Sequence, residues 1–280
     1  MEKSIRVENP KTGKETEFFL QENMRGTAAC TAHIHSAVEL LYIRSGQYTV
    51  TLDGVRYEVA AGDLMLFCSG AVHSVLTGAE NGAYYVIKTP PTVLLDPADP
   101  AGAAYCLRFA LNRGGSRVLW RRTEVEASPL HTILLALMDE YHAGRYAAEI
   151  AIRARITELL VAILREDQMG QAPLPDAAGA LVYRVMRYVQ AHYAEDLDEK
   201  ALSADFGISY SYLSRSFRRV TGMTFKSYLN RTRIARAEQL LLTTDATVSE
   251  IAGACGYNSV SYFISLFRAA TGRTPRAARR

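Results

Sequence analysis

The sequence predicts an α+β protein of two domains, because strand patterns and helix patterns occupy different parts of the chain. Short alternating segments separated by turn residues fill residues 38–88, whereas residues 129–165 and 199–279 carry apolar side chains at helical spacing. A segment of the helical part also recurs fifty residues later in the chain. At roughly 150 residues per domain, a chain of 280 residues is long enough for two cores.

The charge of the chain is divided unevenly. Residues 178–280 contain 15 Lys and Arg against 8 Asp and Glu, a net charge of +7, while the preceding residues contain 17 against 21, a net charge of −4. The basic part indicates a polyanionic partner. The polar start and the lack of an apolar run of about 18 residues predict neither a signal peptide nor a membrane span, so we expect a cytoplasmic protein with no membrane partner. Four cysteines without a CxxC pair indicate neither a zinc knuckle nor a disulfide framework.

Two copies of one unit make up the C-terminal part. Ser211–Thr224 recurs as Ser261–Thr274, and each copy follows a short helix pattern that ends at a glycine, Gly207 or Gly256. The order in each unit is helix, tight turn, helix. Capping residues mark the helix starts at Ser209, at Thr247 with Glu250, and at Ser259. The predicted C-terminal domain is therefore all-α, with two helix-turn-helix units.

A helix-turn-helix unit presents the start of its second helix to the major groove, where side chains meet base edges and nearby basic residues meet phosphates. We therefore expect duplex DNA as a partner. In the first unit the candidate DNA-binding residues are Ser209, Tyr210, Ser211, Ser214, Arg215, Arg218 and Arg219. In the second unit they are Asn258, Ser259, Val260, Ser261, Ile264, Ser265 and Arg268. The second set is more apolar and suits thymine methyl groups better than guanine, so we expect it to specify less.

A single helix is predicted between the two units. Residues 226–243 form one helical pattern of about 18 residues and about 27 Å, which would fix the distance between two recognition helices lying in successive major grooves, about 34 Å apart. The alternative is that these are packed helices of a basic domain that does not bind DNA. The duplication, the capping residues and the charge together favour DNA binding.

Residues 181–279 resemble the AraC/XylS-type DNA-binding domain. The matching segments are Gly207-Ile-Ser, Tyr212-Leu-Ser-Arg-Ser-Phe, Arg233-Ile-x-x-Ala-x-x-Leu-Leu, Ile251-Ala, Gly256-Tyr, Ser261-Tyr-Phe, Phe267-Arg and Thr271-Gly-x-Thr-Pro. Two positions depart from the pattern, since Ser265 stands where an arginine is often found and Ala278 replaces an aromatic residue. The resemblance implies a transcription regulator, an activator by expectation, that reads asymmetric promoter elements, with RNA polymerase as a further candidate partner.

Short strands are predicted in the N-terminal part. Asp53-Gly54 between two of them is a strong hairpin signal. Many short strands at regular spacing are typical of a small β-barrel or jelly roll. The predicted strands are residues 38–43, 47–52, 55–59, 62–67 and 84–88.

His33, His35, Glu39 and His73 form the second candidate site. Residues two and four apart in a strand point to the same face, so the first three would project into the barrel if their segment is extended, and His73 would come from a neighbouring strand. Three histidines and a carboxylate are ligands suited to zinc, iron, nickel or manganese. The same residues could instead hydrogen-bond a small-molecule effector.

The spacing of these residues resembles the cupin pattern. The matching positions are Gly26, His33-x-His35-x-x-x-Glu39, Gly46, Gly62 and Gly70-x-x-His73, with Cys68-Ser69 where cupins normally have a proline. In cupins the four residues bind metal, whereas AraC-like regulators use a cupin-like barrel as an effector pocket, often without metal. We expect no required cofactor and no catalytic residue. The alternatives are a divalent transition metal in the pocket and a cupin metalloenzyme with a DNA-binding tail. The resemblance implies a carbohydrate effector.

Two amphipathic helices are predicted at residues 129–142 and 146–165, and their short connection makes them an antiparallel hairpin. They either only cover the barrel or also form a homodimer interface, and we favour the second. Residues 168–179 lack periodicity and contain two prolines and two glycines, which indicates a linker. Effector binding in the barrel would then change how the hairpin and the DNA-binding domain are arranged.

The predicted division follows from these patterns. It consists of a cupin-like effector-binding domain at residues 1–122, a helical hairpin at 123–168, a linker at 169–179 and a double helix-turn-helix domain at 180–280.

Overall fold

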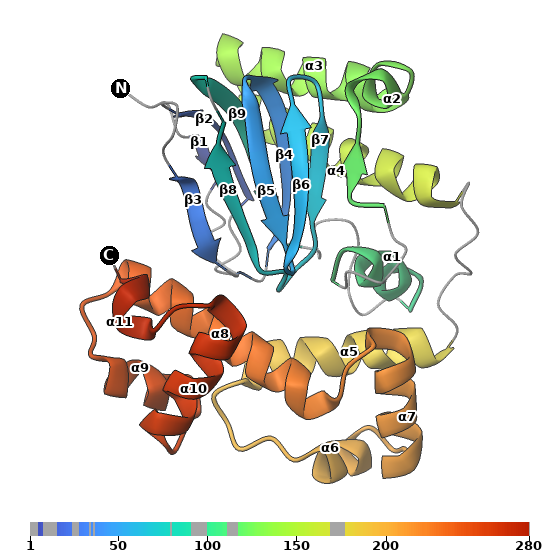
Figure 1. The fold of residues 1–280 in the computed structure, drawn as a ribbon. Helices are drawn as coiled ribbons and strands as arrows, with labels where there is room; N and C mark the ends of the chain where they lie inside the picture. The colour runs from blue at the N-terminus through green and yellow to red at the C-terminus, as the bar shows by residue number, and fades with distance from the viewer. Residues whose placement is uncertain are drawn as a thin grey trace.

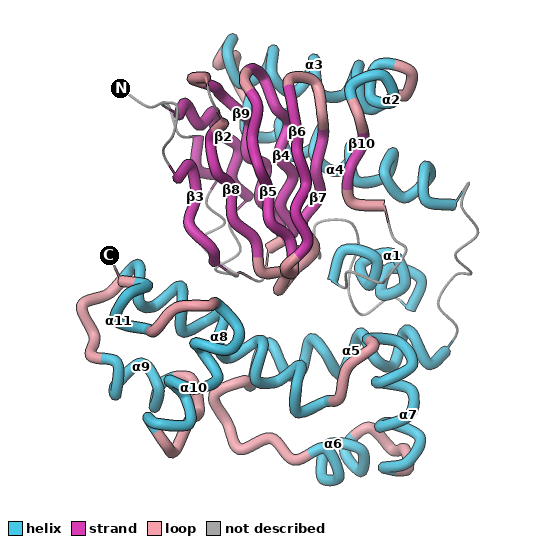
Figure 2. Tube along the Cα trace, in the orientation of Figure 1, coloured by secondary structure: helices cyan, strands magenta, loops and turns pink. Residues whose placement is uncertain are grey.

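The structure, a computed structural model, describes residues 5–7, 16–23, 28–33, 35, 37–78, 80–90, 100–110, 117–168 and 177–279. Strands fill one half of the molecule and helices fill the other, which lies below it in Figure 1. Figure 2 shows that further helices lie along the outside of the strand-rich half. The predicted α+β division is confirmed. Among the described residues, no helix is both long and apolar enough to cross a membrane.

The strands form two sheets. The larger sheet has the order β1-β2-β9-β4-β7-β10 and the smaller has the order β3-β8-β5-β6. The described pairings are antiparallel, as in a barrel or jelly roll. The strand bounds are β1 Ile5–Val7, β2 Thr16–Asn23, β3 Ala28–His33, β4 Val38–Ser45, β5 Gln47–Leu52, β6 Val55–Ala60, β7 Leu64–Phe67, β8 His73–Thr77, β9 Gly82–Thr89 and β10 Leu119–Trp120.

The hairpin predicted at Asp53-Gly54 is present. β5 and β6 pair up to Leu52 and Val55, which leaves two residues in the turn. Asp53 has a φ of 47° and Gly54 has a φ of 85°. Positive φ at both central residues gives a type I′ turn, whose twist matches that of the flanking strands.

Alternate residues of the larger sheet face two different cores. Leu40, Leu64 and Ile87 face a set of covering helices, whereas Leu41 and Val86 face the interior between the two sheets. A sheet that is covered on both faces needs apolar residues on both, which explains the continuous apolar runs of β7 and β9. The polar cluster described below lies on the interior face.

A helical hairpin covers the outer face of the larger sheet. It consists of α3 Pro129–Ala143 and α4 Ala148–Gln168, preceded by the short α2 Arg122–Glu126. Ser128 caps α3 by accepting a hydrogen bond from the Leu130 amide, and Gly144 follows α3 in the left-handed region. The predicted apolar stripes pack on the sheet through Leu130, Ile133, Leu134, Leu137, Met138, Ile152, Ile156, Leu159, Leu160 and Ile163. The hairpin therefore covers the barrel, and its role as a homodimer interface stays a prediction.

The lower half of Figure 1 is helical, as predicted. The pairs α6–α7 and α9–α10 are the two helix-turn-helix units, and α8 is the single helix expected between them. Each unit has its own core, one around Phe217 and α5, the other around Phe263 and α8. The helix bounds are α5 Ala177–His192, α6 Glu199–Asp205, α7 Tyr210–Thr221, α8 Phe225–Thr243, α9 Val248–Ala254, α10 Val260–Thr271 and α11 Pro275–Ala278.

The sequence patterns do not predict α1 or α5. The helix α1, Pro100–Ala110, packs against α5, so that Cys106 and Leu107 lie in the core of the first helix-turn-helix unit and not in that of the barrel. The helix α5 begins at Ala177, inside the segment predicted as a linker. The rest of that segment, residues 169–176, lies outside the described residues.

Candidate functional site

The first candidate site is the outward face of the recognition helices α7 and α10. The hydroxyl of Ser209 accepts a hydrogen bond from the Tyr212 amide at 3.2 Å, and that of Ser259 accepts one from the Tyr262 amide at 3.3 Å. A side-chain cap determines where a helix begins and therefore which residues form its first exposed turn. Both predicted caps are confirmed.

The outward face of α7 holds the predicted DNA-binding residues of the first unit. Arg215 is exposed, and its Nε donates a hydrogen bond to the Ser211 carbonyl at 3.1 Å. Ser214 is half-buried and hydrogen-bonds Glu199 of α6, so it is the least accessible of the set. The other members are all exposed, namely Ser209, Tyr210, Ser211, Arg218 and Arg219. Their contact with DNA stays a prediction, which this exposure supports.

The outward face of α10 is hollowed. Ser261, Ile264, Ser265 and Arg268 line a shallow depression with Ala269 and Thr274. Asn258 and Ser259 are exposed just before the helix, and Val260 is half-buried. Arg268 is the one charged residue in this lining. That the second unit specifies less than the first stays a prediction.

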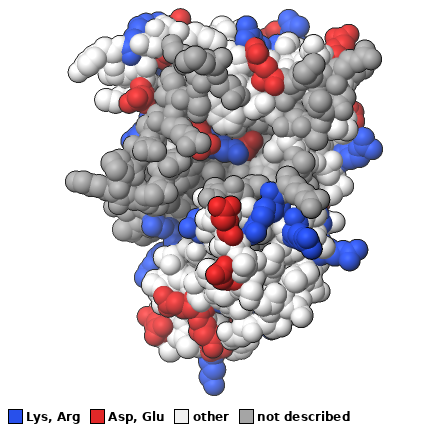
Figure 3. All heavy atoms as spheres, turned by 90° about the vertical axis from the view of Figure 1, so that its left-hand side faces the viewer, with Lys and Arg blue, Asp and Glu red and all other residues white. Residues whose placement is uncertain are grey.

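Part of the basic charge is used inside the protein. The guanidinium of Arg233 is buried and donates to the carbonyls of Tyr193 and Glu195 at 2.7 and 2.8 Å, and Arg273 pairs with the buried carboxylate of Glu238 at 2.8 Å. On the face shown in Figure 3, Lys and Arg side chains gather on the helical half near its junction with the strand-rich half, and acidic side chains lie both beside them and nearer the lower end. The net charge of +7 therefore overstates the charge that DNA can meet.

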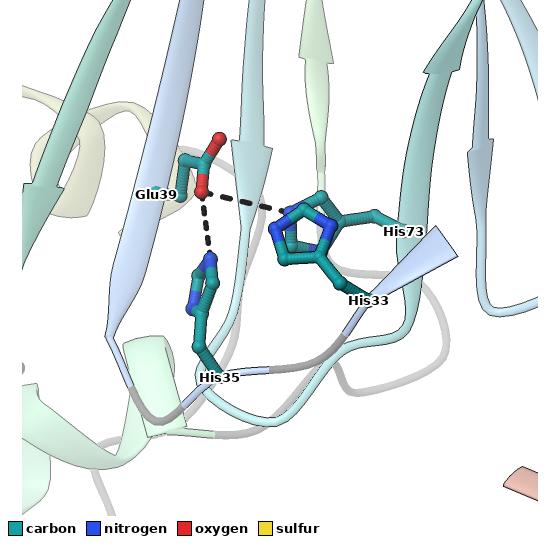
Figure 4. A group of neighbouring side chains, drawn as sticks. All are labelled: His33, His35, Glu39 and His73. Carbon is teal, nitrogen blue, oxygen red and sulfur yellow. Dashed lines mark hydrogen bonds and ion pairs between the residues drawn. The ribbon is translucent and has the colours of Figure 1, made fainter. Parts of the chain in front are cut away.

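The second candidate site lies between the two sheets (Figure 4). His33 ends β3 and is the register partner of His73, which begins β8. Glu39 lies in β4 of the other sheet, and His35 lies between β3 and β4. Potential ligand atoms of the four residues lie within 4.8 Å of one another. The four predicted residues do form one cluster.

The single extended segment expected for residues 33–39 is not formed. β3 belongs to the smaller sheet and ends at His33, whereas β4 belongs to the larger sheet and begins at Val38. The chain passes from one sheet to the other between these residues. His33 and Glu39 therefore meet because the two sheets face each other, and not because of alternation along one strand.

The cluster contains an ionised carboxylate. Burial disfavours the charged form of Glu39, but Lys88 Nζ at 3.1 Å and His35 Nε2 at 2.7 Å from Oε2 outweigh it and hold the pKa of that carboxyl well below its usual value. Burial lowers the pKa of His33 to about 3 and also lowers the pKa of His35. Both of these rings are therefore neutral at neutral pH.

The backbone determines which ring nitrogen of two histidines faces the cluster. His35 Nδ1 lies 3.1 Å from the Ala37 carbonyl and His73 Nδ1 lies 3.0 Å from the Ala71 carbonyl. A carbonyl only accepts, so in a neutral His73 ring the proton is on Nδ1 and Nε2 presents a lone pair to Glu39. His35 Nε2 lies 2.7 Å from the same carboxylate, which only accepts, and donates a hydrogen bond to it. His73 Nε2 is buried, lies 3.5 Å from Glu39 Oε2 and has no hydrogen-bond partner in the described part of the chain.

This arrangement fits a divalent metal ion. The His73 Nε2 lone pair and the Glu39 carboxylate oxygen repel in this buried site unless a cation lies between them, and a metal ion could replace the proton that His35 Nε2 donates to Glu39. Metal-binding histidines commonly donate their other ring N–H to a backbone carbonyl, as His73 does and as the 3.1 Å contact of His35 Nδ1 with the Ala37 carbonyl allows. Three nitrogens and one oxygen suit a transition metal.

Two further residues border the cluster. The ring of Phe67 stacks on that of His73, with centroids 4.3 Å apart. Cys30 Sγ lies 3.3 Å from His33 Nδ1, and burial together with the charge of Glu39 raises the pKa of the thiol to about 11. Cys30 is therefore a neutral thiol and not a thiolate ligand at neutral pH.

The loop that precedes His73 joins the cluster to the helical half. The Gly70 amide donates a hydrogen bond to the His35 carbonyl at 2.7 Å. The Gly70 carbonyl accepts a hydrogen bond from Arg231 Nε, which belongs to α8. Arg231 Nη2 also lies 3.2 Å from Asp53 Oδ1 in the turn between β5 and β6. One glycine thus contacts both a candidate ligand residue and the helical half.

Lys88 and Arg231 are not among the site residues predicted from sequence. Lys88 shares one face of β9 with Tyr84 and Val86, which face the interior, and this alternation is the signal that could have identified it. Arg231 and Gly70 are 161 positions apart, and no local pattern connects them.

The geometry defines a class of protein in which a helical half with two outward-facing recognition helices is attached to a barrel that holds a polar cluster. Residues 202–280 match the family of the helix-turn-helix domain, and residues 19–88 match the family of the cupin domain. The chain therefore carries a cupin-like domain followed by a helix-turn-helix domain, an arrangement that agrees with its resemblance to AraC-type regulators.

Curated relatives and solved structures agree with this assignment. The chain is 33% identical over 163 residues to the HTH-type transcriptional activator RhaS of Salmonella dublin, and 31% identical over 162 residues to RhaS of Salmonella arizonae. Each match covers 57% of this chain and 56% of the relative, so the chain spans little more than half the length of these relatives. The fold is similar to that of ToxT from Vibrio cholerae with bound unsaturated fatty acid, with a TM-score of 0.62, 14% identity and 97% coverage of both chains.

Proposed function

We propose that the protein is a transcription regulator that binds promoter DNA through α7 and α10 and responds to a small molecule bound in the barrel. The observation that carries this proposal is the pair of capped helix-turn-helix units, each with an exposed polar face opposite its own core. The Salmonella relatives are named as transcriptional activators, which supports an activator over the alternative of a cupin metalloenzyme with a DNA-binding tail.

The DNA test uses the full chain, because α1 completes the core of the first unit. A fragment that contains only the C-terminal helix-turn-helix domain would lack α1. The experiment measures binding to genomic duplex fragments across a salt series, with Arg215→Ala as the variant and Arg155→Ala, an exposed arginine of α4, as its control. We expect Arg215→Ala to lose discrimination between sites and Arg155→Ala to leave it unchanged. Failure of the wild-type chain to bind duplex DNA at low salt would contradict the proposal.

The quaternary proposal is a homodimer that acts in the cytoplasm, with RNA polymerase as the partner of the promoter-bound form. Its support is the exposure of three large apolar side chains on the hairpin, Leu135, Tyr146 and Ile150, at 48%, 103% and 73%. Ile150→Glu should convert a dimer to a monomer in sedimentation velocity. A monomeric wild-type protein at high concentration would rule out the dimer.

The cofactor proposal is a divalent transition metal held by His33, His35, Glu39 and His73. It is supported by the buried Nε2 of His73, which has no hydrogen-bond partner among the described residues and lies 3.5 Å from Glu39 Oε2, and by the closeness of the four potential ligand atoms. Such an ion would act as a Lewis acid that binds an oxygen of the effector. Calorimetric titration with Zn²⁺ tests it, with loss of binding expected for His73→Ala and unchanged binding for His131→Ala, a histidine of α3. Absence of stoichiometric binding to the wild-type chain would show that the cluster works without metal.

The coupling proposal concerns the Gly70 loop. A ligand that changes the position of His35 or His73 changes the loop that precedes His73 and hydrogen-bonds His35, and through Gly70 it changes the contact with Arg231 on α8. A ligand shifts such an equilibrium only by binding two arrangements with different affinity. The two arrangements here differ in whether α8 is held against the barrel. Equal DNA affinity with and without the ligand would exclude this mechanism.

A further inference from the structure

Lys88 is the feature of the barrel that metal binding alone leaves unexplained. Its side chain is 24% exposed and its Nζ lies 3.1 Å from Glu39 Oε2, the oxygen that also faces His35 and His73. Lys88 is the register partner of Glu39 on one side and of Glu17 on the other. These three residues therefore form a row on the interior face, with an ammonium between two carboxylates.

The formal charge of this row changes sign when a metal binds. Two carboxylates and one ammonium leave a charge of −1, and the neighbouring histidines add none when neutral. A divalent ion changes the total to +1. A buried, uncompensated charge is costly, so the metal-loaded pocket is stabilised by a ligand that carries one negative charge.

The ammonium of Lys88 is placed to hold such a ligand. An ammonium has three N–H donors, and a single contact with Glu39 leaves donors for an anion beside the metal. Lys88 Nζ lies 3.1 Å from the Glu39 carboxylate, an ion pair in which the side chain serves as a cation that pairs with anions, rather than as a neutral amine that attacks carbonyl groups.

We propose that the barrel binds a small carboxylate, with one oxygen on the metal and the carboxylate paired with Lys88. This inference rests on the metal proposed above and specifies the effector class further. A sugar acid meets both requirements, because it combines hydroxyl groups with a carboxylate. A neutral sugar would leave the charge of the metal-loaded pocket uncompensated.

The test uses the full-length chain loaded with Co²⁺, whose visible spectrum reports a ligand entering the metal sphere. The ligands are glycolate, which carries a hydroxyl beside a carboxylate, and ethylene glycol, its neutral counterpart. We expect glycolate to bind and to change the spectrum, and ethylene glycol to bind far more weakly. Lys88→Met should weaken glycolate binding by roughly 10- to 100-fold, the loss expected when a charged hydrogen-bond donor is removed. Lys226→Met, on the exposed first turn of α8, is the matched control.

The outcomes separate the two proposals. If Co²⁺ does not bind, the metal proposal fails and the carboxylate inference fails with it. If Co²⁺ binds but glycolate binds no better than ethylene glycol, or binds Lys88→Met as well as the wild-type chain, the metal stands and the inference is overturned. Uptake of one Co²⁺ by Lys88→Met with a thermal transition like that of the wild-type protein shows that the variant is folded.

Discussion

The main chain of Gly70 connects His35 to Arg231 through two hydrogen bonds, one donated by its amide and one accepted by its carbonyl. His35 belongs to the polar cluster of the barrel, and Arg231 belongs to α8, the helix between the two helix-turn-helix units. The contact thus links the two candidate sites with one residue between them. Val72, two residues on, packs against the core of the second unit, so the same loop contacts the helical half at two points.

Arg231→Ala is the first test of this link. The substitution removes a charged donor from a carbonyl and from Asp53, so we expect it to lower the free energy of unfolding by about 1–3 kcal/mol. We also expect the DNA affinities of metal-free and metal-loaded protein to become equal, because α8 is no longer held by the barrel. Fluorescence anisotropy with a labelled duplex measures both affinities. Lys226→Ala, on the same helix, should keep the wild-type difference, and persistence of that difference in Arg231→Ala would refute the link.

Gly207 and Gly256 occupy equivalent turns and offer a matched pair of substitutions. Both have positive φ, 68° and 80°, so alanine at either should cost about 1–2 kcal/mol of stability. A Cβ on Gly207 meets open space, whereas one on Gly256 would lie 2.7 Å from the Ala194 carbonyl oxygen. We expect Gly256→Ala to cost roughly 1–3 kcal/mol more, as overpacked sites do. Urea unfolding measures both, and equal costs would contradict the predicted clash.

Arg233 fixes the second unit to the end of α5. Its guanidinium donates to the carbonyls of Tyr193 and Glu195 and lies 5.4 Å from the centre of the Tyr257 ring. Arg233→Met should destabilise the protein by about 2–4 kcal/mol, because the carbonyls lose charged partners. Arg233→Lys should recover only part of this, since one ammonium cannot reproduce the planar fork. Thermal unfolding checks the order, and full recovery by lysine would show that charge alone matters.

The helical half was predictable because its information is local. Ser209, Ser259 and the Thr247–Glu250 capping box each act within three residues, and the structure has all of them. The helix α5 was not predicted because the prolines before it indicated a linker, and the predicted end of that linker, residue 179, lies beyond the first residue of the helix, Ala177. The helix α1 escaped because it supplies Cys106 and Leu107 to a core that is distant in sequence.

The members of the barrel cluster were predictable, but not the way in which they meet. The spacing of His33, His35 and Glu39 suggested one strand, whereas the structure divides them between two sheets and a connection. Sequence alternation describes one strand and carries no information on which sheets face each other. Lys88 lies beside the cluster because it is the register partner of Glu39 in the neighbouring strand. Only the tertiary structure shows this strand pairing.

A substitution at Ser265 tests whether the second helix-turn-helix unit can contribute to base recognition. It is exposed in the hollow of α10, beside Ile264 and Arg268, at a position where AraC-type sequences often have arginine. An arginine there could donate two hydrogen bonds to guanine, a contact that discriminates by about 1–3 kcal/mol. We therefore expect Ser265→Arg to add a guanine preference at one end of the binding site, as measured by selection from a randomised duplex library. Ser265→Lys is the control for charge alone and should strengthen binding to all sequences alike. Identical selected sites for wild-type protein and Ser265→Arg would mean that α10 does not reach the base edges.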